Sequence, residues 1–201
     1  YSGDGVSNNS SMSFDGNSDY IIIPNSNSLN PTELTVAFWT KLDSYSGGSN
    51  YGYNHFVNKW DGPNHQYIIS SNTIGLYVYI DNQLYQSNHL PDLNDWEHVS
   101  FTYSSTTGEG VIYINADTVY NFNSTAQLQS TIMDLHIGGN SSVNVSYNTV
   151  DGLMDEVQLW DVVLDSNQIQ EYMNCPPTGS EEGLVGYWNF EEGSGTTAYD
   201  Q

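Results

Sequence analysis

The sequence predicts an all-β protein: an antiparallel β-sandwich of the jelly-roll type, with one short helix near its C-terminus. Apolar and polar residues alternate through many short segments, which is the periodicity of a strand. Turn residues recur at intervals of about ten positions, as is typical of sandwiches and barrels. Only residues 161–173 have the composition of a helix, and the length of 201 residues suits one full sandwich.

The first part of the chain predicts a tail and three strands. Residues 1–10 are rich in Gly, Ser and Asn, as expected of a linker or N-terminal tail. Residues 11–24 predict two strands joined by a tight turn at Asp15-Gly16. Residues 34–41 carry apolar side chains on both faces, so this strand is expected to be central. One face carries Leu34, Val36, Phe38 and Thr40, and the other carries Thr35, Ala37, Trp39 and Lys41.

The middle of the chain predicts a series of paired strands. Their expected ranges are 55–60, 66–70, 74–80, 83–86, 96–103, 109–115, 118–122 and 135–139. Turns are expected at Asp81-Asn82 and Ala116-Asp117. Alternation predicts that the following side chains face the core: Ile74, Leu76, Val78, Ile80, Val99, Phe101 and Tyr103. The side chains expected on the opposite faces are Tyr77, Tyr79, Trp96 and His98.

The segment 151–160 predicts the strand around which the chain is organised. It begins with a glycine turn, and its side chains alternate, with Val157 and Leu159 on one face and Met154 and Trp160 near the other. This pattern indicates a buried strand.

A short helix is expected directly after that strand. Asp165 can cap its first turn, and Gln168 lies three residues further on, as in a capping box. Residues 183–195 then predict a strand that closes the same sandwich, followed by a tail over 196–201. The same residues also fit the opening strand of a second repeat.

Four motifs, in order, resemble those of laminin-G-like (LamG/pentraxin-type) domains of the concanavalin A-like lectin/glucanase superfamily. They are SMSFDG with DYIIIP (11–24), WEHVSFTY (96–103), LHIGG (135–139) and DGLMDEVQLW (151–160). The resemblance implies a single LamG-like sandwich over residues 11–195, with 183–195 as its closing strand.

Composition and charge exclude several partners. The chain has 24 acidic and only 2 basic residues, a formal net charge of −22 at pH 7. No basic patch can form, so nucleic acids and anionic membrane surfaces are not expected partners. The single cysteine excludes an internal disulfide, and no segment has the length of a membrane span. The abundance of Tyr, Asn, Ser, Thr and Gly indicates an extracellular module of a larger secreted or cell-surface protein whose other parts carry the targeting signal.

No motif of a catalytic site appears in the sequence. Glycoside hydrolases of this fold place their acids at alternate positions of one strand. Asp155 and Glu156 are adjacent and are expected to point to opposite faces, and so are Glu191 and Glu192. We therefore expect a non-catalytic module, whose parent is a glycoside hydrolase, a polysaccharide lyase or a surface protein.

The resemblance implies a calcium ion at one edge of the sandwich. Its ligands would be the carboxylates of Asp15, Asp19 and Asp155, with a backbone oxygen of Gly16 or a neighbour. The alternative is structural: Asp15 serves the turn, Asp19 caps its own backbone, and Asp155 accepts a buried hydrogen bond.

Tyrosines and amides predict a sugar-binding surface. Sugar rings stack on aromatic faces, and their hydroxyls need polar partners. The candidate aromatic and His residues are Tyr77, Tyr79, Tyr67, Tyr85, Tyr51, Tyr53, Trp60 and His65, and the polar partners are Asp61, Asn54, Asn58 and Asn64. The alternative is that many of these aromatics serve cross-strand pairing or the core.

The sequence thus favours a lectin-like, carbohydrate-binding module of a secreted, bacterial, polysaccharide-degrading or surface protein. Calcium would assist it. The alternative is an adhesion or spacer domain with a stabilising calcium ion.

Overall fold

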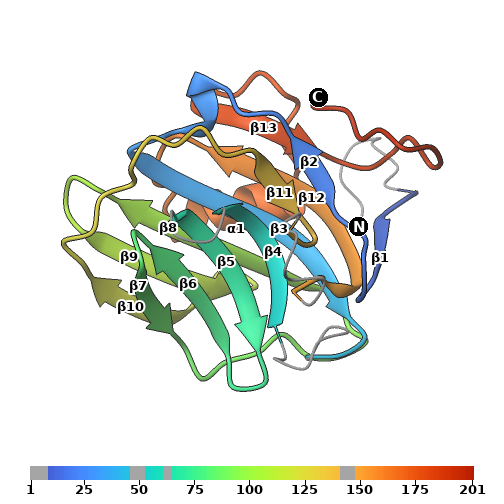
Figure 1. The fold of residues 1–201 in the computed structure, drawn as a ribbon, viewed down its shortest axis with the longest axis horizontal. Coiled ribbons are helices and arrows are strands. Elements are labelled where there is room, and N and C mark those ends of the chain that lie inside the picture. Colours follow the sequence, from blue (N-terminus) through green and yellow to red (C-terminus); the bar gives the residue numbers. More distant parts are fainter. Residues whose placement is uncertain (1–8, 46–52, 61–64, 141–147) are drawn as a thin grey trace.

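A computed structural model describes residues 9–45, 53–60, 65–140 and 148–201, in which two antiparallel sheets face each other (Figure 1). The predicted β-sandwich is confirmed. The strands are β1 (Met12–Asp15), β2 (Ile21–Ile23), β3 (Glu33–Leu42), β4 (Tyr53–Trp60), β5 (His65–Asn72), β6 (Leu76–Ile80), β7 (Gln83–Gln86), β8 (Glu97–Ser104), β9 (Glu109–Ile114), β10 (Asp117–Asn123), β11 (Leu135–Ile137), β12 (Asp151–Trp160) and β13 (Leu184–Trp188). A 3-10 helix, η1 (Asn27–Leu29), and an α-helix, α1 (Ser166–Asn174), complete the elements.

Strand β12 holds the larger sheet together. This seven-stranded sheet has the order β1-β12-β3-β8-β9-β10, and β13 also pairs with β12. Strand β1 pairs with the first half of β12, where Met12 lies opposite Met154, and β13 pairs with the second half, where Trp188 lies opposite Val157. The six-stranded sheet has the order β2-β11-β4-β5-β6-β7 and lies in front of the larger sheet in Figure 1.

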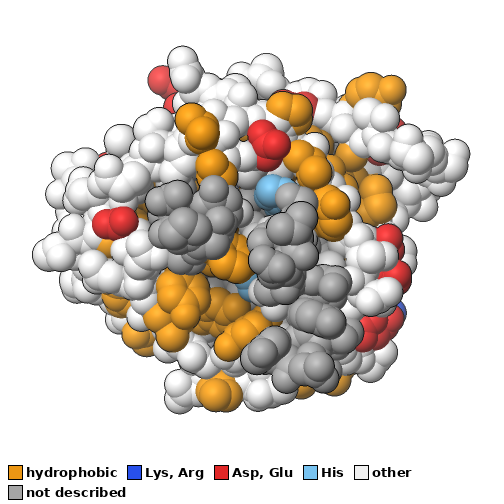
Figure 2. Space-filling model, in the orientation of Figure 1, with side chains coloured by type: hydrophobic (Ala, Val, Ile, Leu, Met, Phe, Trp, Pro, Cys, Tyr) orange, Lys and Arg blue, Asp and Glu red, His pale blue; other side chains and the backbone are white. Residues whose placement is uncertain are grey.

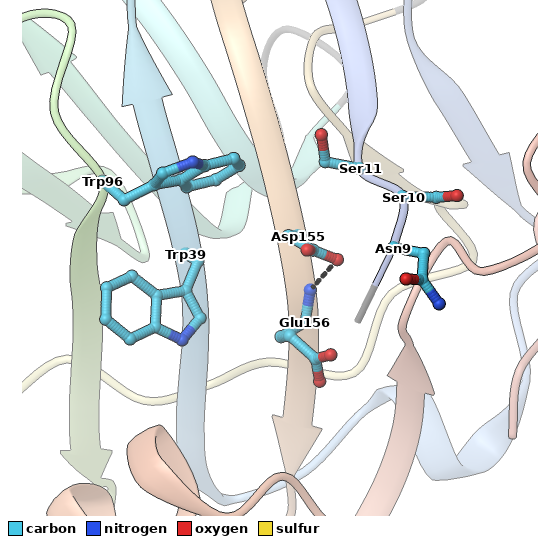
Figure 3. Close-up of a pocket in the computed structure, with 7 residues that line it drawn as sticks. All are labelled: Asn9, Ser10, Ser11, Trp39, Trp96, Asp155 and Glu156. Atoms are coloured by element: carbon cyan, nitrogen blue, oxygen red, sulfur yellow. Dashed lines mark hydrogen bonds between the residues drawn. The ribbon is translucent and has the colours of Figure 1, made fainter. Parts of the chain in front are cut away.

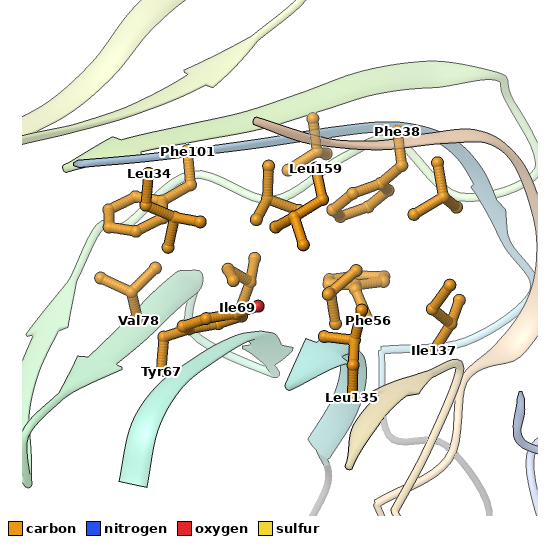
Figure 4. Close-up of a cluster of buried hydrophobic side chains, with 14 of the residues drawn as sticks. Leu34, Phe38, Phe56, Tyr67, Ile69, Val78, Phe101, Leu135, Ile137 and Leu159 are labelled. Carbon is orange, nitrogen blue, oxygen red and sulfur yellow. The ribbon is translucent and has the colours of Figure 1, made fainter. Parts of the chain in front are cut away.

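The core fills the space between the two sheets. Figure 4 shows side chains of both sheets meeting there: Leu34, Phe38, Phe101 and Leu159 from the larger sheet, and Phe56, Tyr67, Ile69, Val78, Leu135 and Ile137 from the smaller. The rings of Phe38 and Phe56 have centroids 4.9 Å apart across the interface. The predicted inner face of β3 is confirmed, and β3 lies centrally between β12 and β8.

A β-bulge interrupts β12 halfway along its length. The register with β3 shifts there, and Glu156 has a left-handed φ of 52°. An extra residue in one strand changes which face the following residues occupy. Met154 and Val157 consequently both face the core, whereas Trp160 packs on the outer side. The prediction that Met154 shares a face with Trp160 is wrong, because a strict period of two assumes an unbroken strand.

Two hairpins are closed by residues with positive φ at both central positions, as in type I′ turns. Asp81 and Asn82 have φ of 44° and 63°, and Asn115 and Ala116 have φ of 52° and 65°. The second turn lies one residue earlier than the sequence pattern places it. Ile74 was expected in the core but is 64% exposed, because it belongs to the turn before β6.

The predicted capping box of the helix is confirmed. The Asp165 carboxylate accepts hydrogen bonds from the backbone N–H groups of Asn167 and Gln168, and the Gln168 side chain accepts from the N–H of Asp165. The helix packs on the outer face of the larger sheet, where the rings of Trp160 and Tyr172 have centroids 4.6 Å apart. No helix in the described part of the chain is long and apolar enough to cross a membrane.

Candidate functional site

A hollow opens on the outer face of the smaller sheet, opposite to the core. Its volume is about 280 Å³, close to the lower end of the range of about 300–1,000 Å³ for small-molecule sites. Figure 2 shows this face, on which hydrophobic side chains gather in the hollowed part. We call it the tyrosine hollow, and the residues that line it are Tyr53, His55, Trp60, Ile68, Asn72, Tyr77, Tyr79, Leu84, Gln86 and Asn148.

Strand register explains why these side chains meet. Tyr77 lies opposite Gln86 of β7, and Tyr79 lies opposite Leu84 of β7 and Ile68 of β5. Opposed residues of neighbouring strands project to the same face of the sheet, with β-carbons about 5 Å apart. Val78, between the two tyrosines of β6, points into the core. Tyr77, Tyr79 and their cross-strand partners therefore project together from the outer face of the sheet.

Five rings in the tyrosine hollow form a continuous array. The ring centroids are 6.0 Å apart for His55 and Trp60, 6.3 Å for Tyr53 and His55, 5.7 Å for Tyr53 and Tyr77, and 5.8 Å for Tyr77 and Tyr79. Three of these contacts are edge-to-face, an arrangement that the ring quadrupoles favour. Each ring therefore packs against at least one neighbour, and the five rings form one continuous surface feature.

Polar groups at the rim of the tyrosine hollow are held in place by the backbone. The Oδ1 atom of Asn72 accepts hydrogen bonds from the N–H groups of Ile74 and Gly75 and from Nε2 of Gln86. The backbone oxygen of Asn148 accepts a hydrogen bond from the N–H of His55, which ties this residue to β4. The side-chain amides of Asn72 and Gln86 are therefore held beside the rings by hydrogen bonds.

The phenol of Tyr77 stays neutral. Burial raises its pKa above the usual range, although a hydrogen bond with Ser70 acts in the opposite direction. A neutral phenol can both donate and accept a hydrogen bond. The floor of the tyrosine hollow consequently carries no charge from this group.

The structure brings together only part of the predicted sugar-binding set. Tyr77, Tyr79, Tyr53 and Trp60 all line the tyrosine hollow. Tyr51, Asp61 and Asn64 lie outside the described residues, and for His65 only the backbone is described, in β5.

Two tyrosines that were predicted to bind sugar lie instead on the core side of the smaller sheet, so this prediction is wrong for them. Tyr67 is fully buried in the core, and Tyr85 lies opposite Val78, with its ring stacked on Phe122 at a centroid distance of 3.8 Å. Neither ring can stack on a ligand in the tyrosine hollow. The two-residue turn between β6 and β7 pairs Ile80 with Gln83. Tyr85 therefore lies opposite Val78 and faces the core with it.

The predicted amides Asn54 and Asn58 are structural. Asn54 Nδ2 donates to the backbone oxygen of Ser44, and its Oδ1 accepts from the N–H of Asp151. Asn58 Nδ2 donates to the backbone oxygen of Gly139. Both side chains are fully buried and join β4 to neighbouring segments by hydrogen bonds, so they are not available to a ligand.

Several residues of the tyrosine hollow were missed by the sequence reasoning. Leu84 and Gln86 could have been found from the two-residue turn at Asp81-Asn82, which fixes the register of β7 against β6. His55 could have been found from alternation with Tyr53. Asn148 could not, because it reaches the site from a loop far along the chain.

Known proteins share both the sequence pattern and the fold. A laminin-G family profile, described as the concanavalin A-like lectin/glucanases superfamily, matches residues 15–170. The chain belongs to the concanavalin A-like superfamily. No curated protein sequence matches it closely enough to count as a relative.

Several solved structures resemble this one at low sequence identity. A protein from Bacteroides ovatus whose assigned role is carbohydrate binding has a TM-score of 0.77 at 20% identity, over 94% of this chain and 54% of that one. This chain thus spans about half of that protein. A heptameric SAP-like pentraxin from Limulus polyphemus has a TM-score of 0.61 at 16% identity, over 93% and 94% of the two chains. Domain 4 of an extracellular arabinanase from Geobacillus stearothermophilus, in complex with arabinotriose, has a TM-score of 0.61 at 17% identity, over 80% and 75%.

The calcium ligands implied by the concanavalin A-like resemblance do not meet in this chain. Register places Asp15 opposite Asp151, whereas Asp155 lies four residues further along β12, a separation of about 13 Å. The three carboxylates cannot share one ion. Within the described residues, no three His, Cys, Asp or Glu side chains group so that they could hold a metal ion.

The Asp15 side chain stabilises its own turn, which is the structural role given above as the alternative to calcium binding. Oδ1 of Asp15 accepts hydrogen bonds from the N–H groups of Asn17, Ser18 and Asp19, and Oδ2 of Asp19 accepts from the N–H of Asp15. These bonds lower the pKa of Asp15 from its ordinary value. The proposed set of calcium ligands is therefore wrong, whereas calcium binding by this chain stays a prediction.

Asp155 and Glu156 were expected on opposite faces of their strand, and this is corrected. The bulge and the left-handed φ of Glu156 bring both carboxylates to one pocket on the outer face of the larger sheet. His98 lies under the same region, with its ring 5.4 Å from that of Trp39. Burial lowers the pKa of His98 to about 4, so it stays neutral at pH 7.

Proposed function

We propose that this chain is a non-catalytic carbohydrate-binding module and that the tyrosine hollow is its binding site. The observation that carries the proposal is the continuous array of rings from Trp60 to Tyr79, with the amides of Asn72 and Gln86 beside it. Aromatic faces match the C–H faces of sugar rings, and fixed amides match their hydroxyls. Carbohydrate binding is also the assigned role of the Bacteroides ovatus protein with the same fold.

The proposal extends to the setting in which the module works. We infer an extracellular module tethered to a larger polysaccharide-degrading or surface protein of a bacterium. The arabinanase domain gives a precedent, because it is one domain of an extracellular enzyme and was solved with an oligosaccharide. The acidic charge of −22 favours a neutral glycan over a uronic-acid or sulfated one.

Binding to immobilised and soluble polysaccharides tests the proposal. We expect retention on a neutral glycan, with millimolar to micromolar affinity as is normal for one small site. Trp60→Ala and Tyr79→Ala should each weaken binding about 5- to 30-fold, the loss of one stacking ring. Trp96→Ala is the matched control, because Trp96 is a surface tryptophan with 40% exposure that directly precedes β8 of the opposite sheet.

Two results of this experiment would change the proposed function. Retention on no neutral, uronic-acid or sulfated glycan would favour an adhesion or spacer domain. Equal loss in the Trp96→Ala protein would show that binding does not occur in the tyrosine hollow. A parallel series with calcium and with chelator tests the predicted role of calcium, since loss of retention on chelation would establish it.

A further inference from the structure

A second pocket lies on the outer face of the larger sheet, beside the bulge halfway along β12 and next to Trp39 of β3. Its volume is about 410 Å³, within the range of about 300–1,000 Å³ for small-molecule sites. Figure 3 shows Trp39 and Trp96 on one side of β12 and the segment 9–11 on the other, with Asp155 and Glu156 between them. We call it the tryptophan pocket.

The carboxylates of the tryptophan pocket lie in a largely buried position. Asp155 is 5% exposed and Glu156 is 4% exposed. Oδ1 of Asp155 accepts a hydrogen bond from the N–H of Glu156, which fixes the bulge between them (Figure 3). Two acids are thus held next to indole rings, away from bulk water, where electrostatic interactions are stronger than in water.

A third carboxylate adds to the negative potential. Oε1 of Glu191 accepts hydrogen bonds from the N–H groups of Asn9 and Ser10, at 2.8 and 3.1 Å, so it holds the wall formed by the N-terminal segment. Lys41 and Lys59 are the only basic residues of the whole chain, and neither lines this pocket. Lys59 is held on the other sheet by Asn25, Leu29 and Asn30.

The chemistry of these side chains selects one class of ligand. Tryptophan has the strongest attraction of the aromatic side chains for a cation above its face, and aromatic cages recognise substituted ammonium groups. Anionic ligands are excluded by the three carboxylates, and a neutral sugar would use the rings but gain nothing from the charges. We propose that the tryptophan pocket binds the substituted ammonium group of a small organic cation, independently of glycan binding at the tyrosine hollow.

The affinity for such a cation depends on the ionisation of Glu156. Its carboxylate faces Asp155 on its own strand, Tyr187 of β13, and Glu191 of the C-terminal segment. Burial and these acids raise its pKa to about 7, although the hydrogen bond from Tyr187 acts in the opposite direction. Binding should therefore strengthen as the pH rises from about 6 to about 8 and Glu156 becomes charged.

Choline and its neutral isostere 3,3-dimethylbutan-1-ol test the proposal, because they differ only in the charge of the head group. We expect choline to bind to the whole chain, measured by calorimetry or NMR titration, and the isostere to bind at least 5-fold more weakly. Trp96→Ala and Asp155→Asn should each weaken choline binding about 3- to 30-fold. Glu156→Gln should remove the increase in affinity between pH 6 and pH 8.

Matched controls separate this site from the rest of the molecule. Glu192→Gln removes one acid outside the pocket and should leave choline binding unchanged, as should Trp60→Ala in the tyrosine hollow. Equal binding of choline and the isostere would overturn the cationic class of ligand, and no binding of choline at pH 8 would overturn the site. Glycan retention by the Trp96→Ala protein shows in either case that the fold and the other site are intact.

Discussion

The hydroxyl of Tyr187 on β13 donates a hydrogen bond to Oε2 of Glu156, in the bulge of β12. This bond joins a strand near the C-terminus to the irregular part of the central sheet. Burial is the main cause that raises the pKa of Glu156 to about 7; the bond from Tyr187 acts to lower this pKa, and the nearby charges of Asp155 and Glu191 act to raise it. A buried acid that titrates near neutral pH links stability to pH.

Glu156→Gln should remove part of the pH dependence of stability. In the unfolded chain this carboxyl titrates near 4.5, and in the folded chain near 7. Between these values the folded state binds more protons, so the free energy of unfolding falls as the pH rises from 4.5 to 7. The variant should match the wild type at pH 4.5 and exceed it at pH 8 by on the order of 1–3 kcal/mol.

Urea denaturation at the two pH values measures this difference. Glu192→Gln is the control, because it removes an acid that is only partly buried, whereas Glu156 is buried. Parallel stability profiles for the wild type and the Glu156→Gln protein would show that this carboxyl does not titrate in the expected range.

The sequence sufficed for those parts of the fold that obey a regular period. Alternation placed the inner residues of β3 and the outward Tyr77 and Tyr79 correctly, and the spacing of Asp165 and Gln168 predicted the helix start. These features depend on neighbours a few residues apart, and local backbone geometry determines them.

Irregular geometry and long-range contacts could not be predicted in this way. No residue type in Asp155-Glu156 requires a bulge, and a left-handed φ is uncommon for glutamate. The sequence therefore separated two carboxylates that the structure brings together. Asn148 likewise lies at the tyrosine hollow because its backbone oxygen accepts a hydrogen bond from His55 of β4, a long-range contact that alternation does not report.

Lys59→Met should destabilise the protein by about 2–4 kcal/mol, because it removes three hydrogen bonds of a buried ammonium group and leaves the buried backbone oxygen of Leu29 without this donor. The Nζ atom of Lys59 donates to Oδ1 of Asn25 at 2.7 Å, to the backbone oxygen of Leu29 at 3.1 Å and to Oδ1 of Asn30 at 3.1 Å. These bonds join β4 to the segment around η1.

The second lysine provides the matched control for that change. Lys41 is only partly buried, and Lys41→Met should change the free energy of unfolding by no more than about 0.5 kcal/mol. Chemical denaturation of both variants compares the same substitution in two settings. Equal effects would contradict a structural role for the Lys59 bonds.

Asp165→Ala should cost about 1 kcal/mol of stability, the usual value for a lost N-cap. The carboxylate of Asp165 accepts from two backbone N–H groups at the start of α1. Asp165→Asn is the control, because asparagine caps helices about as well. Thermal unfolding should then show a lowered melting temperature for the alanine variant, and loss of the same size in both variants would assign the effect to charge instead of capping.

Gly138→Ala should destabilise the protein more than Gly193→Ala, although both glycines have a left-handed backbone. Their φ angles are 76° and 68°, so alanine carries a similar conformational cost of about 1 kcal/mol at either position. A β-carbon at Gly138 would lie 2.0 Å from Cε1 of the buried Phe14 ring, whereas at Gly193 the nearest atom is Oγ of Ser10 at 3.7 Å. The difference between the two variants therefore measures the clash, which we expect to add about 1–3 kcal/mol.

A double-mutant cycle with Phe14→Leu identifies the origin of that difference. A smaller side chain at position 14 makes room for the added methyl group, so Gly138→Ala should cost less in the Phe14→Leu background than in the wild type. Denaturant unfolding of the four proteins gives the coupling energy. Strictly additive effects would mean that Phe14 does not oppose the new β-carbon, and that the backbone conformation alone requires glycine at this position of the Ile-Gly-Gly motif.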